Sequence, residues 1–163
     1  MVASSLSDAP SRGAEETNGR DAFAGQPDSD EAEQASLRAA MKGLRVLLVD
    51  DETDTLELLA AALVQSGAEV RPQTNVRDAL EVIKEWKPDV IVSDIAMPDE
   101  DGYSFIRQLR ALPPEDGGAI PAVALTAYVG IKERTRVLSS GFQLYVPKPV
   151  EASELLSTLA SLL

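Results

Sequence analysis

The stretch 44-LRVLLVDDETD-54 joins a short apolar run to a cluster of acids. Residues 44–49 are rich in branched aliphatic side chains, which is typical of a buried β-strand. Four of the next five residues, 50 to 54, are acidic, and they follow the point where the strand ends. Carboxylates crowded at a strand end repel one another, so the cluster needs a cation or a chemical role to account for it.

Strand and helix patterns alternate from Leu44 onward. Asp54 and Glu57 resemble a capping box that opens the first helix, which Gly67 ends. Asn75 is expected to cap the second helix, and Pro88 stops it. Pro72 places the second strand at a sheet edge. The sequence predicts strands at 44–49, 68–73, 89–93, 122–126 and 143–146, and later helices at about 104–112, 131–139 and 151–163.

Five successive strand–helix units predict an α/β fold, a doubly wound, five-stranded parallel sheet with helices on both faces. In such sheets, ligands bind beyond the carboxyl ends of the strands, where the strand order reverses. The strands end at Asp50 and Asp51, at Asp94, at Thr126 and near Lys148, whereas the second strand delivers no charge at its end, only Thr74 and Asn75. The strand order 2-1-3-4-5 of a flavodoxin-like fold explains this, because the second strand then lies outside the first.

This topology brings five side chains to one edge of the sheet: Asp50, Asp51, Asp94, Thr126 and Lys148. Three neighbouring carboxylates need a cation, and Mg²⁺ is a hard ion that takes carboxylates, carbonyls and water. A carboxylate can also attack phosphorus and form an aspartyl phosphate. The lysine and the hydroxyl would then hold phosphoryl oxygens. The pattern therefore predicts a phosphate-accepting metal site.

Composition excludes several other chemistries. The 163 residues include neither Cys nor His, which removes thiol chemistry and histidine-based catalysis. The net charge of −12 argues against a nucleic-acid surface. No apolar run reaches ~18 residues, and no secretory signal pattern is found, so membrane insertion is not expected. We expect a cytoplasmic protein.

Residues 1–43 differ from the rest of the chain. They contain 4 Lys or Arg and 8 Asp or Glu, and Phe23 is their only aromatic residue. Such a segment buries too little apolar surface to offset its ordering entropy. We expect 1–43 to be a disordered acidic tail or linker, with a marginal short helix over 30–43, and 44–163 to be the folded domain.

Four motifs resemble the receiver domain of response regulators, the CheY-like phosphoacceptor of two-component signalling. They are 46-VLLVDDE-52, 89-DVIVSDIAMPDEDGY-103, 121-PAVALTA-127 and 145-YVPKPV-150, in the family's order. The resemblance implies that Asp94 is phosphorylated, that Asp51 binds the metal directly and that Asp50 binds through water. The backbone carbonyl of Ala96 would be a further ligand. Mn²⁺ is expected to substitute for Mg²⁺.

The resemblance assigns further roles. Thr126 becomes the switch hydroxyl, Lys148 the phosphate-binding lysine, and Tyr145 the aromatic residue that changes rotamer. The Lys148–Pro149 bond is expected to be cis. Ala96 and Tyr128 would flank the path of the attacking water, while Met97, Pro98 and Gly102 match the loop that shapes the pocket. The structural alternatives are helix N-terminal charges for the acids, ordinary packing for Tyr145 and a solvated position for Lys148.

As a receiver, the domain promotes only its own phosphorylation and dephosphorylation and is not a separate enzyme. A histidine kinase or histidine phosphotransfer protein would supply the phosphoryl group. A downstream protein, or a second copy of the domain, would bind the face of the fourth helix, fifth strand and fifth helix. Three contexts stay open: a stand-alone receiver, the receiver of a hybrid histidine kinase, and a fragment of a response regulator. A small phosphatase with an Asp nucleophile is the alternative of another class.

Overall fold

The computed structural model describes residues 29–127 and 130–163. The chain divides into two units, residues 1–36 and residues 37–163, and the second contains the whole sheet. Within the described ranges, no helix combines the length and apolar character needed to cross a membrane.

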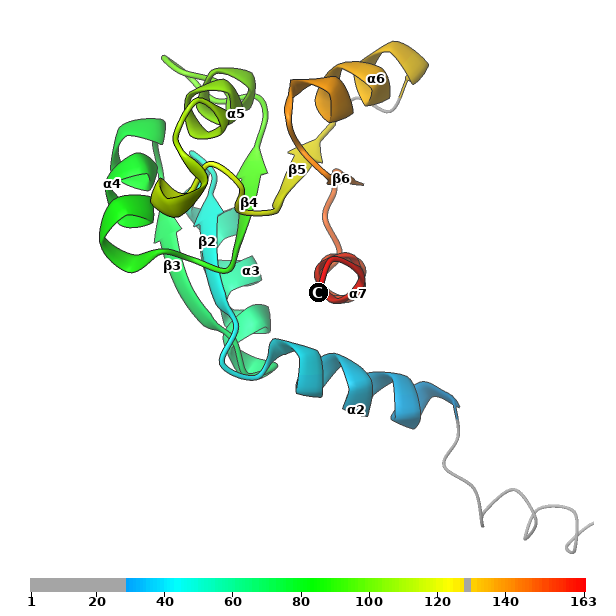
Figure 1. The fold of residues 1–163 in the computed structure, drawn as a ribbon. Helices are drawn as coiled ribbons and strands as arrows, with labels where there is room; N and C mark the ends of the chain where they lie inside the picture. Colours follow the sequence, from blue (N-terminus) through cyan, green and yellow to red (C-terminus); the bar gives the residue numbers. More distant parts are fainter. Residues whose placement is uncertain (1–28, 128–129) are drawn as a thin grey trace, which may run out of the picture. The chain divides into compact units, whose positions relative to one another are not determined.

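The central sheet has five parallel strands in the order β3-β2-β4-β5-β6 (Figure 1). This is the predicted order 2-1-3-4-5, so the doubly wound, flavodoxin-like prediction is confirmed. Its strands are β2 (Arg45–Val49), β3 (Glu69–Gln73), β4 (Val90–Asp94), β5 (Ala122–Thr126) and β6 (Leu144–Pro147). The reversal of strand order lies between β2 and β4, where Val49 pairs with Ser93. The carboxyl ends of these two strands therefore meet directly.

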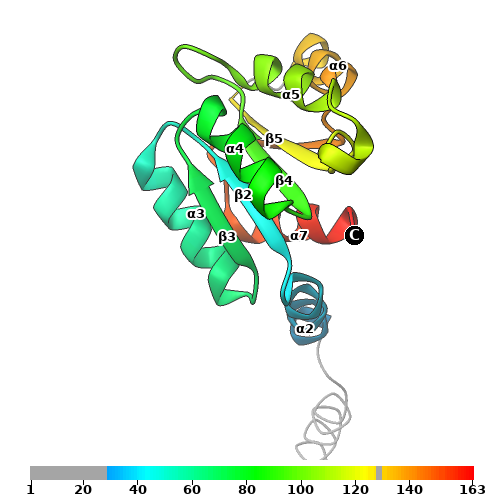
Figure 2. The same ribbon diagram turned by 60° about the vertical axis from the view of Figure 1, so that its left-hand side comes forward.

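Helices cover both faces of the sheet (Figure 2). One face carries α4 (Val76–Trp86), α5 (Gly102–Arg110) and α6 (Ile131–Ser140), and the other carries α3 (Thr53–Gln65) and α7 (Ala152–Ser161). A short 3-10 helix, η1 (Pro114–Asp116), precedes β5. Each face has its own apolar cluster, so the sheet separates two cores.

Alternation along the strands decides which core each side chain enters. In β2, Leu47 and Val49 belong to the core under α4, α5 and α6, whereas Val46 and Leu48 belong to the core under α3 and α7. Successive strand residues point to opposite faces, so the same parity extends to the residues at the strand ends. This parity sorts the site residues described below.

The helix starts show which local signals were read correctly. Asn75 caps α4, because its side chain accepts a hydrogen bond from the backbone N–H of Asp78 at 2.8 Å. The capping box at Asp54 and Glu57 was wrong: α3 begins at Thr53, and its N-cap residue is Glu52, which makes no side-chain cap. Helix α5 also begins earlier than the predicted Ser104, because Asp101 accepts from the Ser104 N–H at 2.9 Å.

The segment before β2 packs further than the sequence indicated. Helix α2 (Ser29–Met41) is formed, and Met41 is fully buried in the core under α3 and α7. The backbone N–H of Gly43 donates to Gly67 at 2.9 Å. The compact unit thus starts before the predicted boundary at residue 44. The predicted disorder of residues 1–28 lies outside the described residues.

Candidate functional site

The strand ends bring four buried or half-buried polar groups together. Asp50 directly follows β2 and is fully buried, while Asp94 and Thr126 are the last residues of β4 and β5 and are each 2% exposed. Lys148 follows β6 and is half-buried. These are four of the five polar side chains that strand topology predicted for this edge, and burial of so many polar groups requires partners.

Lys148 bridges the acids. Its ammonium Nζ lies 3.1 Å from Oδ1 of Asp94 and 3.6 Å from Oδ2 of Asp50. Strand parity explains this meeting, because Asp50, Asp94 and Lys148 continue the alternation that faces α3 and α7. The predicted convergence of these three side chains is therefore present.

Asp50 has one satisfied and one unsatisfied oxygen. Its Oδ1 accepts a hydrogen bond from the backbone N–H of Glu52 at 2.9 Å. Its Oδ2 is buried and has no hydrogen-bond partner among the described residues, since the Lys148 contact is too long for a hydrogen bond. A buried anionic oxygen without a donor is costly, so it is suited to meet a cation or an ordered water.

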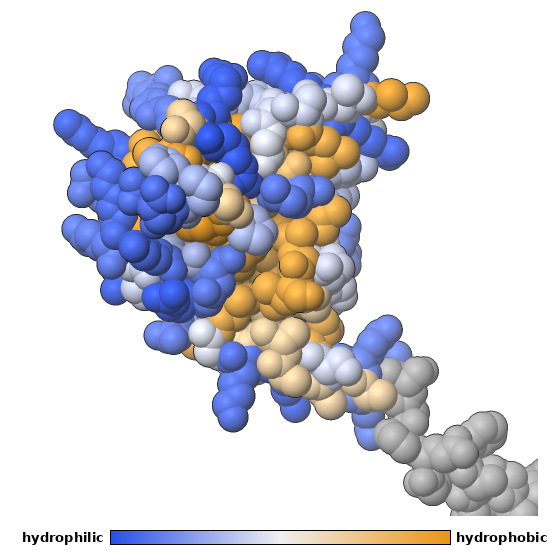
Figure 3. All heavy atoms as spheres, in the orientation of Figure 1, coloured by the Kyte–Doolittle hydropathy of each residue, from blue (hydrophilic) through white to orange (hydrophobic). Residues whose placement is uncertain are grey.

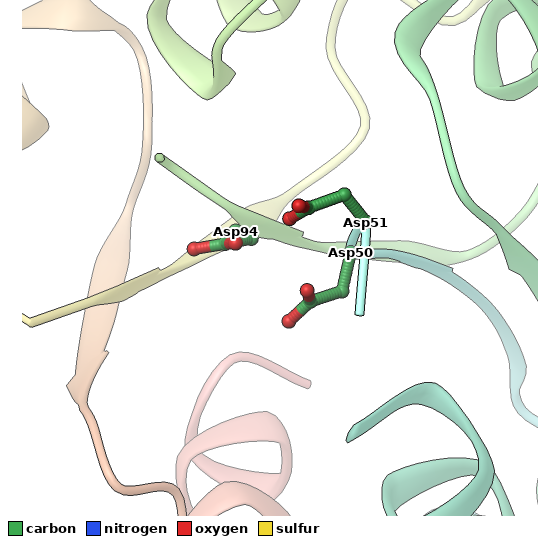
Figure 4. A group of neighbouring side chains, drawn as sticks. All are labelled: Asp50, Asp51 and Asp94. Carbon is green, nitrogen blue, oxygen red and sulfur yellow. The ribbon is translucent and has the colours of Figure 1, made fainter. Parts of the chain in front are cut away.

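Asp51 completes a cluster of three carboxyl groups. One oxygen each from Asp50, Asp51 and Asp94 can be chosen so that all lie within 4.8 Å of one another. Figure 4 shows the three side chains gathered beyond the ends of β2 and β4. Asp51 is exposed whereas the other two are buried, so the cluster opens to solvent on the Asp51 side. An all-oxygen, open set of this kind fits Mg²⁺ or Mn²⁺.

The electrostatics of the pair follow from this crowding. The pKa of Asp94 is raised to about 6, chiefly by burial and next by the negative charge of Asp50, while Lys148 opposes the rise. Burial likewise raises the pKa of Asp50. Burial lowers the pKa of Lys148, but its hydrogen bond to Asp94 and the charges of Asp94, Asp50 and Glu52 outweigh that effect and raise it overall. The lysine is therefore held charged and the acids resist ionisation.

Thr126 and Tyr145 lie toward the other face. Tyr145 packs against the core under α4, α5 and α6, and it pairs across the strands with Ala124, two residues before Thr126. By strand parity Thr126 faces the same side. The Tyr145 ring is half-buried, and the guanidinium carbon of Arg134 lies 5.9 Å from its centre. The two predicted switch residues are thus near neighbours on one face.

The loop after β4 places the remaining predicted residues beside the acids. Ala96 and Pro98 are exposed, Met97 is buried, and Asp99 adopts a positive φ of 69°. Gly102 closes the loop: a Cβ there would lie 2.5 Å from the Asp94 carbonyl oxygen, so only glycine fits. The Lys148–Pro149 bond is cis, as predicted. Tyr128, predicted to flank the site, lies outside the described residues.

Two further groups escaped the sequence prediction. Glu52 places Oε1 4.0 Å from Lys148 Nζ, so a fourth acid borders the lysine. Tyr103 on α5 is buried and donates its hydroxyl hydrogen bond to Glu133 on α6. Glu52 is part of the acidic cluster in the sequence, but its contact with Lys148 depends on where the lysine side chain lies in the structure. Arg136, three residues after Glu133 on α6, lies over the Tyr103 ring. No local sequence signal links either α6 residue to Tyr103.

Comparison with known proteins gives a consistent result. Residues 46–160 match the family model described as the response regulator receiver domain. The response regulator MprA of Mycolicibacterium vanbaalenii is 37% identical over 120 residues, which cover 74% of this chain and 50% of that protein. Hybrid signal transduction histidine kinase D of Dictyostelium discoideum is 35% identical over 134 residues, covering 78% of this chain and 9% of the kinase.

A solved structure agrees in fold. The chemotaxis protein CheY4 of Vibrio cholerae superimposes with a TM-score of 0.69 at 27% identity, covering 74% of this chain and 99% of that one. The chain thus spans about half of MprA and about a tenth of the hybrid kinase, but nearly all of CheY4. The match of the family model to most of the chain decides the assignment: the protein belongs to the response regulator receiver domain family of two-component signalling.

Proposed function

We propose that Asp94 is the residue of this receiver that accepts the phosphoryl group. The observation that carries the proposal is the buried Asp94 carboxylate at the end of β4, 3.1 Å from Lys148 Nζ and beside two further carboxyl groups. A strand-end carboxylate that is buried yet paired with a cation combines nucleophile and charge stabiliser in one place.

The chemistry assigned to the residues is an in-line displacement at phosphorus. A carboxylate oxygen of Asp94 forms a new bond to phosphorus, while the bond from phosphorus to the donor breaks. The donor's leaving group, an imidazole nitrogen of a phosphohistidine or the carboxylate of an acyl phosphate, keeps the electron pair. Lys148 and the Thr126 hydroxyl hold the transferred oxygens, so positioning and charge supply the catalysis. Hydrolysis by water returns the carboxylate.

Asp50, Asp51, Asp94 and the backbone carbonyl of Ala96 would hold Mg²⁺, for which Mn²⁺ can substitute. The buried, donorless Oδ2 of Asp50 and the 4.8 Å spacing of the three carboxyl groups fit a hard divalent cation. When bound, the ion neutralises carboxylate repulsion and supplies charge for the phosphoryl oxygens. Asp51 is the exposed acid and would be a direct ligand, whereas Asp50 would act through water.

The output side is proposed to be the face of α6, β6 and α7. Engagement of Thr126 by the phosphoryl group would open space that Tyr145, on the same face, can fill; this is a shift between two packings. Apolar side chains gather along the β5–β6 and α7 side of the molecule in Figure 3. On α6, Ile131 is 80% exposed and Leu138 46% exposed. A protein partner or a second copy of the domain would bind there.

Receiver domains act with histidine kinases or phosphotransfer proteins, and such a protein is the proposed phosphoryl donor here. The similarity to both a response regulator and a hybrid kinase leaves the parent context open among stand-alone receiver, hybrid-kinase receiver and response-regulator fragment. A pocket beside Lys148, lined by Glu52, Thr55, Leu58, Leu59, Pro149 and Val150, gives a donor an apolar approach to this side of the site.

Intact-mass analysis tests the proposal. With acetyl phosphate and Mg²⁺ the chain should gain one phosphoryl group, and omission of Mg²⁺ should greatly reduce the gain. Asp94→Asn should gain none, whereas Asp99→Asn, which removes an exposed acid from the nearby loop, is its matched control and should be labelled like the wild type. Failure to accept phosphate, with steady turnover of a phosphate ester instead, would favour the small-phosphatase alternative.

A further inference from the structure

The helices α5 and α6 are joined by a polar contact that the phosphoacceptor site does not use. The Tyr103 side chain, on α5, is buried and its hydroxyl donates to Oε1 of Glu133 on α6. The guanidinium carbon of Arg136 lies 3.9 Å from the centre of the Tyr103 ring. Burial and the Glu133 contact raise the pKa of Tyr103 to about 12, so the phenol keeps its proton at neutral pH. We call the contacts of Tyr103 with Glu133 and Arg136 the Tyr103–α6 link.

The α5 end of the link is fixed to the acceptor strand. The Gly102 N–H donates to the Ile95 carbonyl at 2.8 Å, and a Cβ on Gly102 would meet the backbone of Asp94 and Ile95. Asp101 caps the helix at the same point. The backbone next to Tyr103 is therefore tied to the residues directly around Asp94.

The first turns of α6 have few other contacts: Arg134 lies over the Tyr145 ring, and Arg110 of α5 donates to the Gly141 carbonyl at the opposite end of the helix. Of the ten residues of α6, only Val137 is buried, and its N-cap residue, Gly130, offers no side-chain bond. Glu133 lies in the first turn of α6, seven residues after Thr126. A displacement of Thr126 toward Asp94 would pull on this turn, while Tyr103 stays with the acceptor strand. Figure 1 shows α5 and α6 neighbouring each other at this side of the sheet.

We propose that Tyr103, Glu133 and Arg136 are positioning residues that hold α6 in its resting place and oppose the switch. The inference rests on the proposed function, because it concerns the conformational change that phosphate at Asp94 would drive. Binding of a phosphoryl group and breakage of the link are then thermodynamically coupled. Weakening the link should therefore strengthen binding of a phosphoryl mimic, by up to the factor by which it disfavours the resting state.

The alternative is that the contact only stabilises the fold. In that case, removing the Tyr103 hydroxyl lowers the unfolding free energy but leaves the affinity for a phosphoryl mimic unchanged. Tyr103→Phe is a sharp probe, because it deletes the hydrogen bond and retains the ring under Arg136. Glu133→Ala removes the acceptor from a half-buried position and serves if Tyr103→Phe disturbs the core. Glu115→Ala, an exposed acid on η1, is the charge-matched control.

The experiment titrates each variant with beryllofluoride and Mg²⁺ and follows amide NMR shifts around Asp94. We expect Tyr103→Phe and Glu133→Ala each to lower the half-saturating concentration by about fivefold or more, while Glu115→Ala matches the wild type. The double variant should behave like either single variant, since both break one link. Amides of α6 should also exchange faster in the two single variants without ligand.

Two results would overturn the inference in different ways. If the wild type binds beryllofluoride but both single variants have an unchanged or higher half-saturating concentration, the proposed function stands and the link has no regulatory role. No beryllofluoride binding by the wild type, together with no labelling by acetyl phosphate, would remove the proposed function and this inference together.

Discussion

Lys148 Nζ lies 3.1 Å from Oδ1 of Asp94, although β6 and β4 are not neighbours and β5 separates them. The lysine reaches back across the carboxyl ends of the sheet to a buried acid. The same ammonium is 3.6 Å from Asp50 Oδ2. One cation therefore offsets part of the repulsion between two buried carboxylates.

Replacing Lys148 by Gln should destabilise the metal-free protein. The change keeps much of the side-chain volume but leaves two buried acids without their cation, at a cost of roughly 1–3 kcal/mol. Denaturant unfolding at pH 7 without divalent ions measures the loss. The exposed Lys132→Gln on α6 is the control and should be nearly neutral. Equal behaviour of the two variants would contradict the stabilising role of Lys148.

The metal-free protein should become less stable as the pH rises from 5 to 7. The pKa of Asp94 is about 6 in the fold and lies above its ordinary value of 3.8, so the folded state holds the extra proton in this window. Stability contributed by that proton is complete below pH 4 and is lost as the pH rises through about 6. The raised pKa of Asp50 acts in the same direction.

Mg²⁺ should reverse this trend, because it competes with the proton for the same carboxylates. Thermal unfolding at pH 5, 6 and 7, with and without Mg²⁺, should show stabilisation by the ion that grows with pH. Asp94→Asn should weaken both the metal-free pH dependence and the response to Mg²⁺. A Mg²⁺ response that is equal at all three pH values would contradict the assignment.

Gly102→Ala should damage the site from the backbone side. The new Cβ would lie 2.5 Å from the Asp94 carbonyl oxygen and 2.8 Å from the Ile95 Cα, which are not free to move aside. We expect a loss of roughly 1–3 kcal/mol from overpacking. Gly130→Ala is the matched control, because nothing lies within 4 Å of its added Cβ. Similar unfolding midpoints for the two variants would show that the loop can yield.

Thr126→Ala should separate phosphorylation from its transmission. The acceptor and Lys148 are retained, so acetyl phosphate should still label the variant, but the hydroxyl that couples phosphate to the Tyr145 side is missing. The measurement is the amide NMR shifts of residues 126–150, with and without beryllofluoride. Thr135→Ala, exposed on α6, is the control. Equal shift changes in the wild type and in Thr126→Ala would contradict the proposed coupling between the phosphate site and Tyr145.

Much of this site was predictable because a parallel sheet delivers all its strand ends to one edge. The positions of Asp50, Asp94, Thr126 and Lys148 follow from strand spacing and order alone. Parity along the strands adds which face each side chain takes, once the two cores are known. The cis bond before Pro149 and the site roles came from the family's motifs, and spacing alone does not contain them.

Other features depend on packing between elements and have no local signal. The Tyr103–α6 link depends on the distance between two helices that are far apart in the chain, since α5 ends at Arg110 and α6 starts at Ile131. Met41 is fully buried in the core under α3 and α7, and the polar composition of residues 1–43 gives no sign of that contact. Asp54 and Glu57 have the residue types of a capping box, but α3 already begins at Thr53, soon after the end of β2, so Asp54 lies inside the helix.

The site of phosphorylation is the most direct test of the account. The chain is treated with acetyl phosphate and Mg²⁺, reduced with borohydride so that an aspartyl phosphate becomes homoserine, and mapped by peptide mass spectrometry. We predict that the converted residue is Asp94, with Asp50 and Asp51 unmodified. Conversion at Asp50 or Asp51, or equal phosphorylation of an Asp94→Asn variant, would contradict the central claim.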